Sequence, residues 1–336
     1  MEIWNSLQRA VLNYWRGNLT NNSKDGSNYF CRCKEELQSF PAKIERNWRK
    51  LESEATTGGD CIRVVQWNHL SQCLGTKCDK LVRCDPAALL WTSRRWRILE
   101  ELLAQDADII CLQEVDHFDL LERALGSVGY SGRFLAKPDS PCIYMEGNTG
   151  PDGCAIFFKR SKFSLVGWAW RVLEVWRVES NQVVLCATLR HRHLHTELCV
   201  VTTHLKARRG ALLSTLRAEQ GGDILSWLAP ITQHRPVVIT GDFNAPPSEP
   251  VYSTLTSSDK LPLSSAYNLE TLQWTTWKVR DSGEEKYILD YIFHSPALRT
   301  MAVLDPPSQE EVGTDRLPSL SFPSDHLSLV ADIQLQ

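Results

Sequence analysis

The chain has 336 residues, of which 43% are hydrophobic and 23% charged. This composition is typical of a globular protein and excludes disordered, collagenous and coiled-coil chains. Residues 61–336 contain 28 Lys/Arg and 32 Asp/Glu, and their net charge of −4 disfavours a protein that binds mainly by neutralising many phosphates along a polymer.

The first 60 residues are predicted to form an N-terminal extension that is partly flexible. Four apolar residues recur at every fourth position and predict one apolar face of a helix: Ile3, Leu7, Val11 and Trp15. The helix fits either a docking segment or a mitochondrial presequence, and the sequence leaves both open. Residues 17–29, rich in Asn, Ser and Gly, indicate a linker. A short helix is expected after Pro41, with one apolar face formed by Ile44, Trp48 and Leu51.

Two further features bear on the cellular compartment. The sequence has no recognisable secretory signal and no apolar run long enough to cross a bilayer. The eleven cysteines are an odd number without a disulfide-framework spacing, so we expect reduced thiols. The cytoplasm is therefore the first expectation. Mitochondria are the second, because the presequence interpretation stays open.

Residues 61–336 are predicted to form one domain. Short runs of β-branched and apolar residues, separated by turn residues, predict seven strands at 62–67, 109–112, 154–158, 183–189, 198–203, 237–240 and 288–293. Helical patterns run from the Asp85-Pro86 cap to Leu102 and over about residues 211–228. Several neighbouring strands lack a long crossover between them, which disfavours a parallel Rossmann sheet. The pattern predicts an α/β protein in which two packed sheets are flanked by helices.

Polar side chains collect at these strands. Eight of them follow a predicted strand, lie inside the last one or precede the final apolar run: Asn68, Glu114, His204, Asp242, Asn244, Asp290, Asp325 and His326. Alternate residues of a strand share a face, so Asp242 and Asn244 are expected to point to one spot. Each residue alone is more simply a turn or cap residue. Together they indicate one site at the strand ends.

The sequence lacks the motifs of several other enzyme classes. The chain has no Gly-x-Ser-x-Gly elbow, no phosphate-binding P-loop, no Gly-x-Gly-x-x-Gly fingerprint and no His-Glu-x-x-His motif. Carboxylate, amide and imidazole groups without thiolates favour a hard divalent ion. Mg²⁺ is expected, with Mn²⁺ as a substitute.

The sequence from residue 61 to 336 resembles the endonuclease/exonuclease/phosphatase superfamily. Six motifs occur in the order of that family: Gln66-Trp67-Asn68, Leu112-Gln113-Glu114-Val115, Thr203-His204-Leu205, Gly241-Asp242-Phe243-Asn244, Leu289-Asp290-Tyr291-Ile292 and Ser324-Asp325-His326. The resemblance implies a four-layered α/β-sandwich of two packed mixed β-sheets flanked by helices. It also implies a catalytic domain that cleaves phosphate esters with magnesium.

Longer segments resemble one branch of this superfamily, related to poly(A)-removing exonucleases, at residues 113–117, 150–155, 203–208, 275–278 and 322–330. The resemblance implies removal of the 2′-phosphate from NADP⁺ and NADPH. A 3′-to-5′ poly(A) exoribonuclease, with RNA as substrate, is the alternative, although the net charge disfavours it. An inactive binding module is a third alternative. Its expected sign is loss of Glu114, Asp242 or His326, and all three are present.

The chemistry of the side chains suggests their roles. Glu114, with Asn68 beside it, would hold the ion against a phosphoryl oxygen, and Asn68 would also contact the substrate. Asp242 suits the base that orients and deprotonates a water molecule. Asn244 can donate a hydrogen bond to a phosphoryl oxygen.

The remaining polar residues complete the predicted site. His326 would face the phosphate as a donor or acid, with Asp290 fixing its tautomer and favouring its charged form. His204 is expected as a second donor. Asp325 either approaches the ion or supports His326. Three basic residues are expected to bind phosphate groups of the substrate: Lys137, Lys206 and Arg208.

Overall fold

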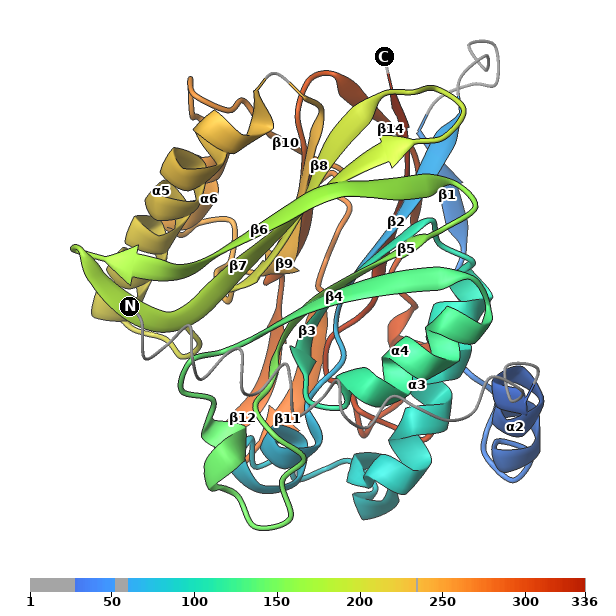
Figure 1. Cartoon of the computed structure of the whole chain (residues 1–336). Coiled ribbons are helices and arrows are strands. Elements are labelled where there is room, and N and C mark those ends of the chain that lie inside the picture. The colour runs from blue at the N-terminus through green and yellow to red at the C-terminus, as the bar shows by residue number, and fades with distance from the viewer. Residues whose placement is uncertain (1–27, 52–59, 234, 336) are drawn as a thin grey trace.

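The structure is a computed structural model that describes residues 28–51, 60–233 and 235–335 (Figure 1). The helix predicted within residues 3–15 lies outside the described residues, as does most of the linker predicted at 17–29. Among the described residues, no helix has both the length and the apolar character needed to span a bilayer.

The first sheet is mixed and has seven strands. Their spatial order is β1 (Trp48–Lys50), β14 (Leu298–Leu304), β15 (Leu329–Leu335), β2 (Cys61–Asn68), β3 (Ile109–Val115), β5 (Gly153–Lys159) and β4 (Tyr130–Ala136). β2 and β3 are parallel, and the other neighbours are antiparallel.

The second sheet has six strands. Their spatial order is β10 (Ser264–Ser265), β13 (Asp290–His294), β9 (Val237–Asp242), β8 (Glu197–His204), β7 (Val178–His191) and β6 (Phe163–Val175). Only β8 and β9 are parallel within it. A separate hairpin is formed by β11 (Thr276–Arg280) and β12 (Gly283–Tyr287).

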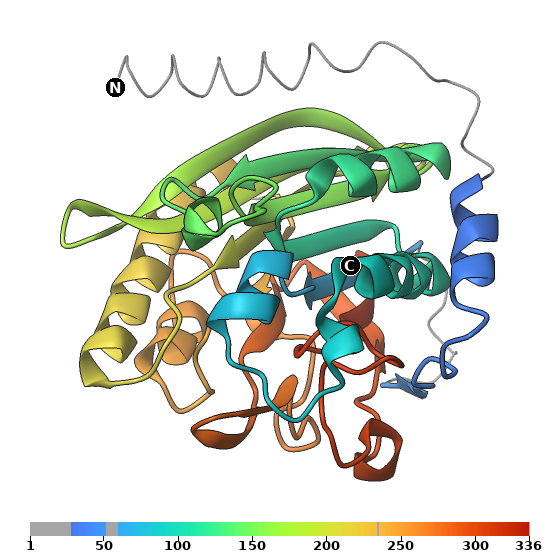
Figure 2. The ribbon, with the colours of Figure 1, turned by 90° about the horizontal axis from the view of Figure 1, so that it is seen from below.

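Helices cover the outer faces of both sheets (Figure 2). The first sheet is covered by α3 (Trp91–Gln105) and α4 (Phe118–Ser127), and α2 (Asn28–Glu36) packs against α3. The second sheet is covered by α5 (Ala211–Thr232) and α6 (Pro250–Thr256). Shorter helical segments are α7 (Gln309–Val312), Leu74–Cys78, Pro86–Leu89 and Pro141–Tyr144.

Alternation of side chains along the strands produces three separate cores. In β2, Val64 packs between the two sheets, whereas its neighbour Val65 packs under α3 and α4. In β7 and β8, Val184 and Val201 pack under α5, while Leu185 and Val200 face the other sheet. Strands buried on both faces read as continuous apolar runs, which is why these segments were recognisable. The four-layered α/β-sandwich of two mixed sheets is confirmed.

Each of the seven predicted strands overlaps a strand of the structure, and the helix predicted at 211–228 is α5. The helix predicted from Asp85 to Leu102 is interrupted. Asp85 Oδ1 accepts a hydrogen bond from Ala87 N–H at 2.8 Å and caps the short segment Pro86–Leu89, and Leu90 is extended before α3 begins. The sequence pattern did not resolve this break.

The short helix predicted after Pro41 is wrong. Residues Trp48–Lys50 form β1, which pairs with β14 and places Trp48 opposite Leu304. Arg49 is anchored by Asp305, with Nη2 3.0 Å from Oδ1. Three apolar residues are too few to fix a period, so pairing with the edge of an existing sheet decided the conformation.

The part of the N-terminal 60 residues that the structure describes thus contributes an edge strand to the first sheet. The division of the chain into an extension, residues 1–60, and a catalytic domain, residues 61–336, stays a prediction.

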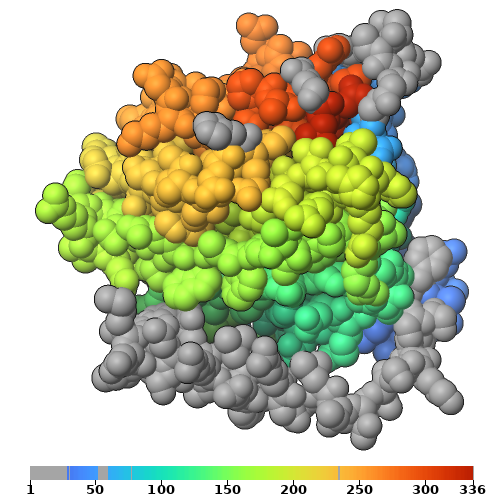
Figure 3. Space-filling view, turned by 45° about the horizontal axis from the view of Figure 1, so that its top comes forward, coloured from blue at the N-terminus to red at the C-terminus, as the bar shows by residue number. Residues whose placement is uncertain are grey.

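On the face seen in Figure 3, the yellow-green residues of β6 and β7 lie beside the gold and orange residues of α5 and α6.

Candidate active site

The site lies where two pairs of parallel strands end, one pair in each sheet. In the first sheet, Asn68 of β2 lies opposite Gln113 of β3. In the second sheet, His204 of β8 lies opposite Asp242 of β9, whose other neighbour in the ladder is Asp290 of β13. Residues in register share a face, so His204, Asp242 and Asp290 are directed together at the first sheet.

The direction of Glu114 comes from a β-bulge in β3. The register between β3 and β5 shifts between Leu112 and Val115, and Glu114 takes a left-handed conformation with a φ of 56°. Its carboxylate is thereby turned toward the end of β2, where Ser71 N–H donates to Oε2 at 3.0 Å. Non-glycine residues with positive φ and bulges both concentrate at functional sites.

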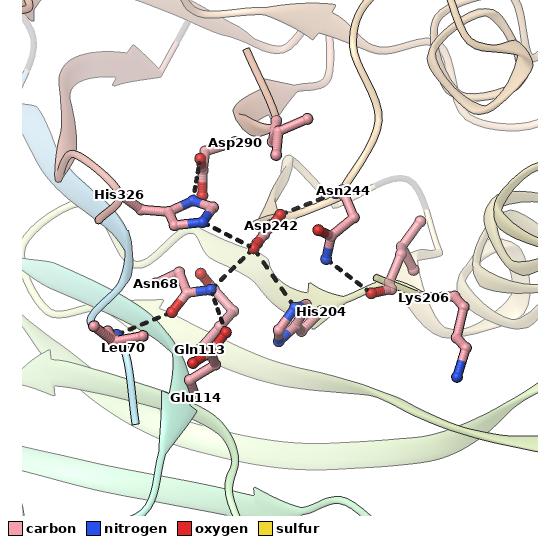
Figure 4. A network of polar contacts seen from close by, with 12 residues as sticks. Asn68, Leu70, Gln113, Glu114, His204, Lys206, Asp242, Asn244, Asp290 and His326 are labelled. Carbon is pink, nitrogen blue, oxygen red and sulfur yellow. Dashed lines mark hydrogen bonds and ion pairs between the residues drawn. The ribbon is translucent and has the colours of Figure 1, made fainter. Parts of the chain in front are cut away.

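The amide of Asn68 joins the two sheets. Its Nδ2 donates to Glu114 Oε1 at 2.8 Å and to Asp242 Oδ2 at 2.9 Å, as Figure 4 shows. Its Oδ1 accepts from Leu70 N–H at 3.0 Å, which fixes the amide orientation. Asn68 therefore acts here as a donor that holds two carboxylates from different sheets beside each other.

The imidazole of His326 lies among carboxylates. Its Nδ1 is 2.8 Å from Asp290 Oδ2, and its Nε2 is 3.8 Å from Asp242 Oδ2. Thr275 fixes Asp290 by donating from Oγ1 to Oδ2 at 2.6 Å. Burial lowers the pKa of His326, but the carboxylates of Asp290, Asp242 and Asp325 outweigh burial and raise the pKa to about 9. His326 is therefore a cation at neutral pH.

This protonation state gives a direct prediction. In the metal-free protein, we expect His326 to titrate near pH 9, which histidine ¹⁵N chemical shifts would measure. Because the folded pKa lies above the ordinary value of 6.5, His326 stabilises the fold fully below pH 6.5, and this contribution is lost as pH rises to about 9. Asp290→Asn should lower the pKa of His326. A wild-type titration below pH 7 would contradict the assignment.

His204 differs from His326 in its charge. Burial, followed by the positive charges of Lys137 and His326, holds the pKa of His204 well below its ordinary value. Lys137 Nζ lies 3.3 Å from Nδ1 and must be the donor, so the proton of the neutral ring is on Nε2, 3.5 Å from Asp242 Oδ2. The buried ammonium of Lys137 is paired with Asp152 Oδ2 at 2.7 Å.

Asp325 lies beside both His326 and Lys278. Its Oδ2 accepts a hydrogen bond from Lys278 Nζ and lies 3.8 Å from His326 Nε2. Burial favours the neutral acid, but the charges of Lys278 and His326 hold the pKa of Asp325 well below its ordinary value. Lys278 Nζ is 3.4 Å from His326 Nε2 and opposes the positive charge of the ring.

Four residues that contact the predicted site residues were not assigned from the sequence. Lys278 is paired with Asp325, and Asp152 is paired with Lys137. Gln66 and Gln113 donate to each other at 2.8 and 2.7 Å, and Gln66 Nε2 also donates to Asp290 Oδ1 at 3.2 Å. All four lie inside segments that carry the family resemblance, so the motifs contained the signal, although no pairing could be read from it.

Three predicted residues lie at the edge of the cluster. Asn244 follows β9 with a φ of 52°, so it does not continue the strand, and its Nδ2 donates to Leu205 O at 3.1 Å. Figure 4 shows the amine of Lys206 directed away from Asp242. Arg208 is exposed, with a φ of 82°. The structure thus brings Lys137 into the cluster and leaves Lys206 and Arg208 on the adjoining loop.

The cluster has the chemistry of a site for a divalent cation. Two sets of side chains place ligand atoms within 4.8 Å of one another: Glu114, His204 and Asp242, and Asp242, Asp290 and His326. Burial, and after it the charge of Asp79, raises the pKa of Glu114 to about 7. A cation beside Glu114 would offset that effect. Carboxylate ligands suit a hard ion, so the residues fit the expected group.

The amino-acid sequence matches that of a known protein family. Residues 65–326 match the profile of the "Endonuclease/Exonuclease/phosphatase family". The chain belongs to this family. The relatives of the chain include an exoribonuclease subunit and a 2′,3′-cyclic phosphatase, and the chain has the fold of this family.

Within the family, the chain is similar to nocturnins. It is 48% identical to Nocturnin of Drosophila melanogaster over 306 residues, which cover 84% of this chain and 48% of that protein. It is 45% identical to Nocturnin of Xenopus laevis over 311 residues, which cover 89% and 79%. The structure of the human Nocturnin catalytic domain with bound sulfate matches with a TM-score of 0.72 and 38% identity, covering 88% of this chain and 100% of that domain. The chain thus spans about half the length of the Drosophila relative.

Two more distant relatives are an exoribonuclease subunit and a cyclic phosphatase. The chain is 28% identical over 325 residues to the CCR4-Not complex 3′-5′-exoribonuclease subunit Ccr4 of Saccharomyces cerevisiae, covering 80% of this chain and 38% of that protein. The structure of ANGEL2, a 2′,3′-cyclic phosphatase, matches with a TM-score of 0.73 and 25% identity, covering 87% of this chain and 99% of the other.

Proposed function

We propose that the protein is a magnesium-dependent phosphatase that hydrolyses the 2′-phosphate of NADP⁺ and NADPH to give NAD⁺ and NADH. The observation that carries this proposal is the buried cluster of Glu114, Asp242 and His326 with a buried ammonium, Lys137, beside it. Opposite charges of this kind recognise a phosphate group and a divalent ion together. The longer motifs shared with nocturnins support the dinucleotide as substrate.

In the proposed reaction, Glu114, with Asn68 beside it, would hold the ion. Mg²⁺, or Mn²⁺ in its place, would neutralise charge on the phosphoryl oxygens. Asp242 accepts a proton from the attacking water, whose oxygen forms the new bond to phosphorus. The bond from phosphorus to the ribose 2′-oxygen breaks, and His326 supplies the proton that this oxygen needs. Inorganic phosphate is released.

The other polar residues position the phosphate. Asn244 and the Nε2–H of His204 donate to phosphoryl oxygens. The predicted contact of Asn68 with the substrate would replace one of the two hydrogen bonds that its Nδ2 donates to Glu114 and Asp242. Asp290 holds the ring of His326, and Asp325 adds negative charge on its Nε2 side.

Purified protein should release phosphate from NADPH in the presence of Mg²⁺. The matched assay uses an oligo(A) RNA, because a 3′-to-5′ exoribonuclease is the second candidate, favoured by the similarity to Ccr4. Adenosine 2′,3′-cyclic phosphate serves as a third substrate, since ANGEL2 is a 2′,3′-cyclic phosphatase. Shortening of RNA without release of phosphate from NADPH would reject the proposal.

Arg208→Ala is expected to lower kcat/KM about ten- to a hundredfold for NADPH and only slightly for 2′-AMP, which lacks the diphosphate. Arg208 lies on an ordered loop, because Arg217 Nη1 donates to the carbonyl oxygens of Lys206 and Arg208, both at 2.8 Å. We propose that Lys137, Lys206 and Arg208 bind the phosphates of the dinucleotide.

The ratio of kcat/KM for NADPH to kcat/KM for 2′-AMP measures the effect of Arg208→Ala on selectivity. Arg177→Ala is the matched control, because Arg177 is also an exposed arginine with positive φ, 66°, but lies in the turn between β6 and β7. Equal losses for NADPH and 2′-AMP in Arg208→Ala would mean that Arg208 contacts the reacting phosphate or supports the fold.

We propose the cytoplasm as the site of action, with mitochondria as the alternative. The odd number of cysteines and the lack of a disulfide-framework spacing support a reducing compartment. Fusing residues 1–30 to a fluorescent reporter tests the choice. Import of the reporter into mitochondria would reject the cytoplasmic assignment.

A further inference from the structure

Arg94 on α3 is buried, with 1% of its surface exposed, and its guanidinium contacts the backbone of residues 69, 70 and 323 next to the candidate site. It donates hydrogen bonds to three backbone carbonyl oxygens. Nε bonds to Pro323 O at 2.7 Å, and Nη2 bonds to His69 O at 2.6 Å and also to Leu70 O. One side chain thus joins two segments that are far apart in the sequence.

Each of these segments carries one half of the candidate site. The end of β2 supplies Asn68, and the segment after it supplies the N–H of Leu70 that orients the Asn68 amide and the N–H of Ser71 that binds Glu114 Oε2. The segment before β15 supplies Asp325 and His326. The backbone of these two segments therefore decides the distance between the ion-binding carboxylate and the imidazole.

Two further hydrogen bonds join the end of β2 to the segment before β15. Ser324 Oγ donates to Asn68 O at 2.6 Å and accepts from His326 N–H at 3.1 Å. Trp67 Nε1 donates to His326 O at 2.8 Å. Arg94 is the charged member of this set, and its rigid fork of donors suits several acceptors in fixed directions.

We infer that Arg94 is a positioning residue that holds the ion-binding half and the histidine half of the site in register. The inference rests on the proposed function, because it takes Glu114 and Asn68 as the residues that hold the ion. None of the hydrogen bonds of Arg94 reaches either of these side chains, so Arg94 acts through the backbone of residues 69, 70 and 323.

The positive charge of Arg94 and its hydrogen bonds have opposite expected effects on ion binding. Burial lowers the pKa of Arg94 to about 10, and Asp116, Asp325 and Glu114 oppose that effect, so Arg94 is a cation at neutral pH. A cation behind Glu114 repels a divalent ion, and loss of its charge alone would strengthen ion binding. Loss of the three hydrogen bonds would weaken ion binding, because Glu114 and Asn68 would no longer be held in place.

Arg94→Lys separates these effects, since lysine keeps the charge but lacks the planar fork. Mn²⁺ binding, measured by electron paramagnetic resonance without substrate, should weaken about 10- to 100-fold. The pKa of His326 in the metal-free variant should also shift from its wild-type value. Neither measurement requires activity on NADPH, so a failure of this inference is distinguishable from a failure of the proposed function.

Arg97→Lys is the matched control. Arg97 lies one turn further along α3, is 4% exposed and donates to two other carbonyl oxygens, Leu320 O at 3.1 Å and Pro41 O at 2.6 Å. It should leave Mn²⁺ binding and the His326 titration unchanged, whatever its effect on the melting temperature. Equal Mn²⁺ affinities for the two lysine variants would overturn the inference.

Arg94→Ala covers the case in which Arg94→Lys does not fold. Free guanidinium, far below denaturing concentration, should occupy the space left by the side chain and restore Mn²⁺ binding when the variant is refolded with it. The same concentration of urea should not. Absence of a guanidinium effect on the alanine variant would also overturn the inference.

Discussion

Asp242→Asn is expected to lower kcat about 10²- to 10⁴-fold, because a positioned general base commonly contributes that factor. Asp242 is 1% exposed, and its carboxylate accepts hydrogen bonds from Asn68 Nδ2 and from Asn244 N–H at 2.9 Å each. Asparagine keeps the shape and can keep an acceptor, but it cannot take a proton. We therefore expect the fold to be retained while the chemical step is lost.

The measurement is kcat on NADPH at saturating Mg²⁺, with circular dichroism and thermal unfolding on the same samples. Asp332→Asn is the control, because Asp332 is a carboxylate paired with Arg63 at 2.7 Å that lies outside the candidate site. A variant at Asp242 that kept the wild-type kcat would show that another group deprotonates the water.

Removal of divalent ions is expected to have the second large effect. An ion on a phosphoryl oxygen stabilises the transition state by several kcal/mol, so chelation with EDTA should lower the rate at least about 10³-fold, and Mg²⁺ or Mn²⁺ should restore it. Glu114→Gln should raise the Mg²⁺ concentration for half-maximal activity at least about tenfold. Glutamine keeps the size of Glu114 but removes the negative charge.

Glu101→Gln provides the comparison for Glu114→Gln. Glu101 is also a buried glutamate, 4% exposed, but it accepts hydrogen bonds from Gln105 and Ser328 away from the cluster. Its substitution should leave the Mg²⁺ dependence unchanged. If the two variants required the same Mg²⁺ concentration as the wild-type protein, Glu114 would not be a ligand of the ion.

Strands and strand ends were predictable from local pattern. The runs in β2, β3, β8 and β9 are buried on both faces, so their apolar character is continuous and each ends at a polar residue. Asn68, Glu114, His204 and Asp242 could be grouped for that reason. Edge elements carried a weaker signal: the short β1 was predicted as a helix, because only its pairing with β14 makes it a strand.

Hydrophobic periodicity and residue type were enough to predict the α/β class, the order of the motifs and the polar residues that gather at the strand ends. The pairing and the charge of those residues became clear only from the fold. A bulge directs Glu114, Asp290 makes His326 a cation, burial and then Lys137 keep His204 neutral, and Arg208 stays on the adjoining loop. These properties depend on burial and on neighbours from distant strands, and no local pattern encodes them.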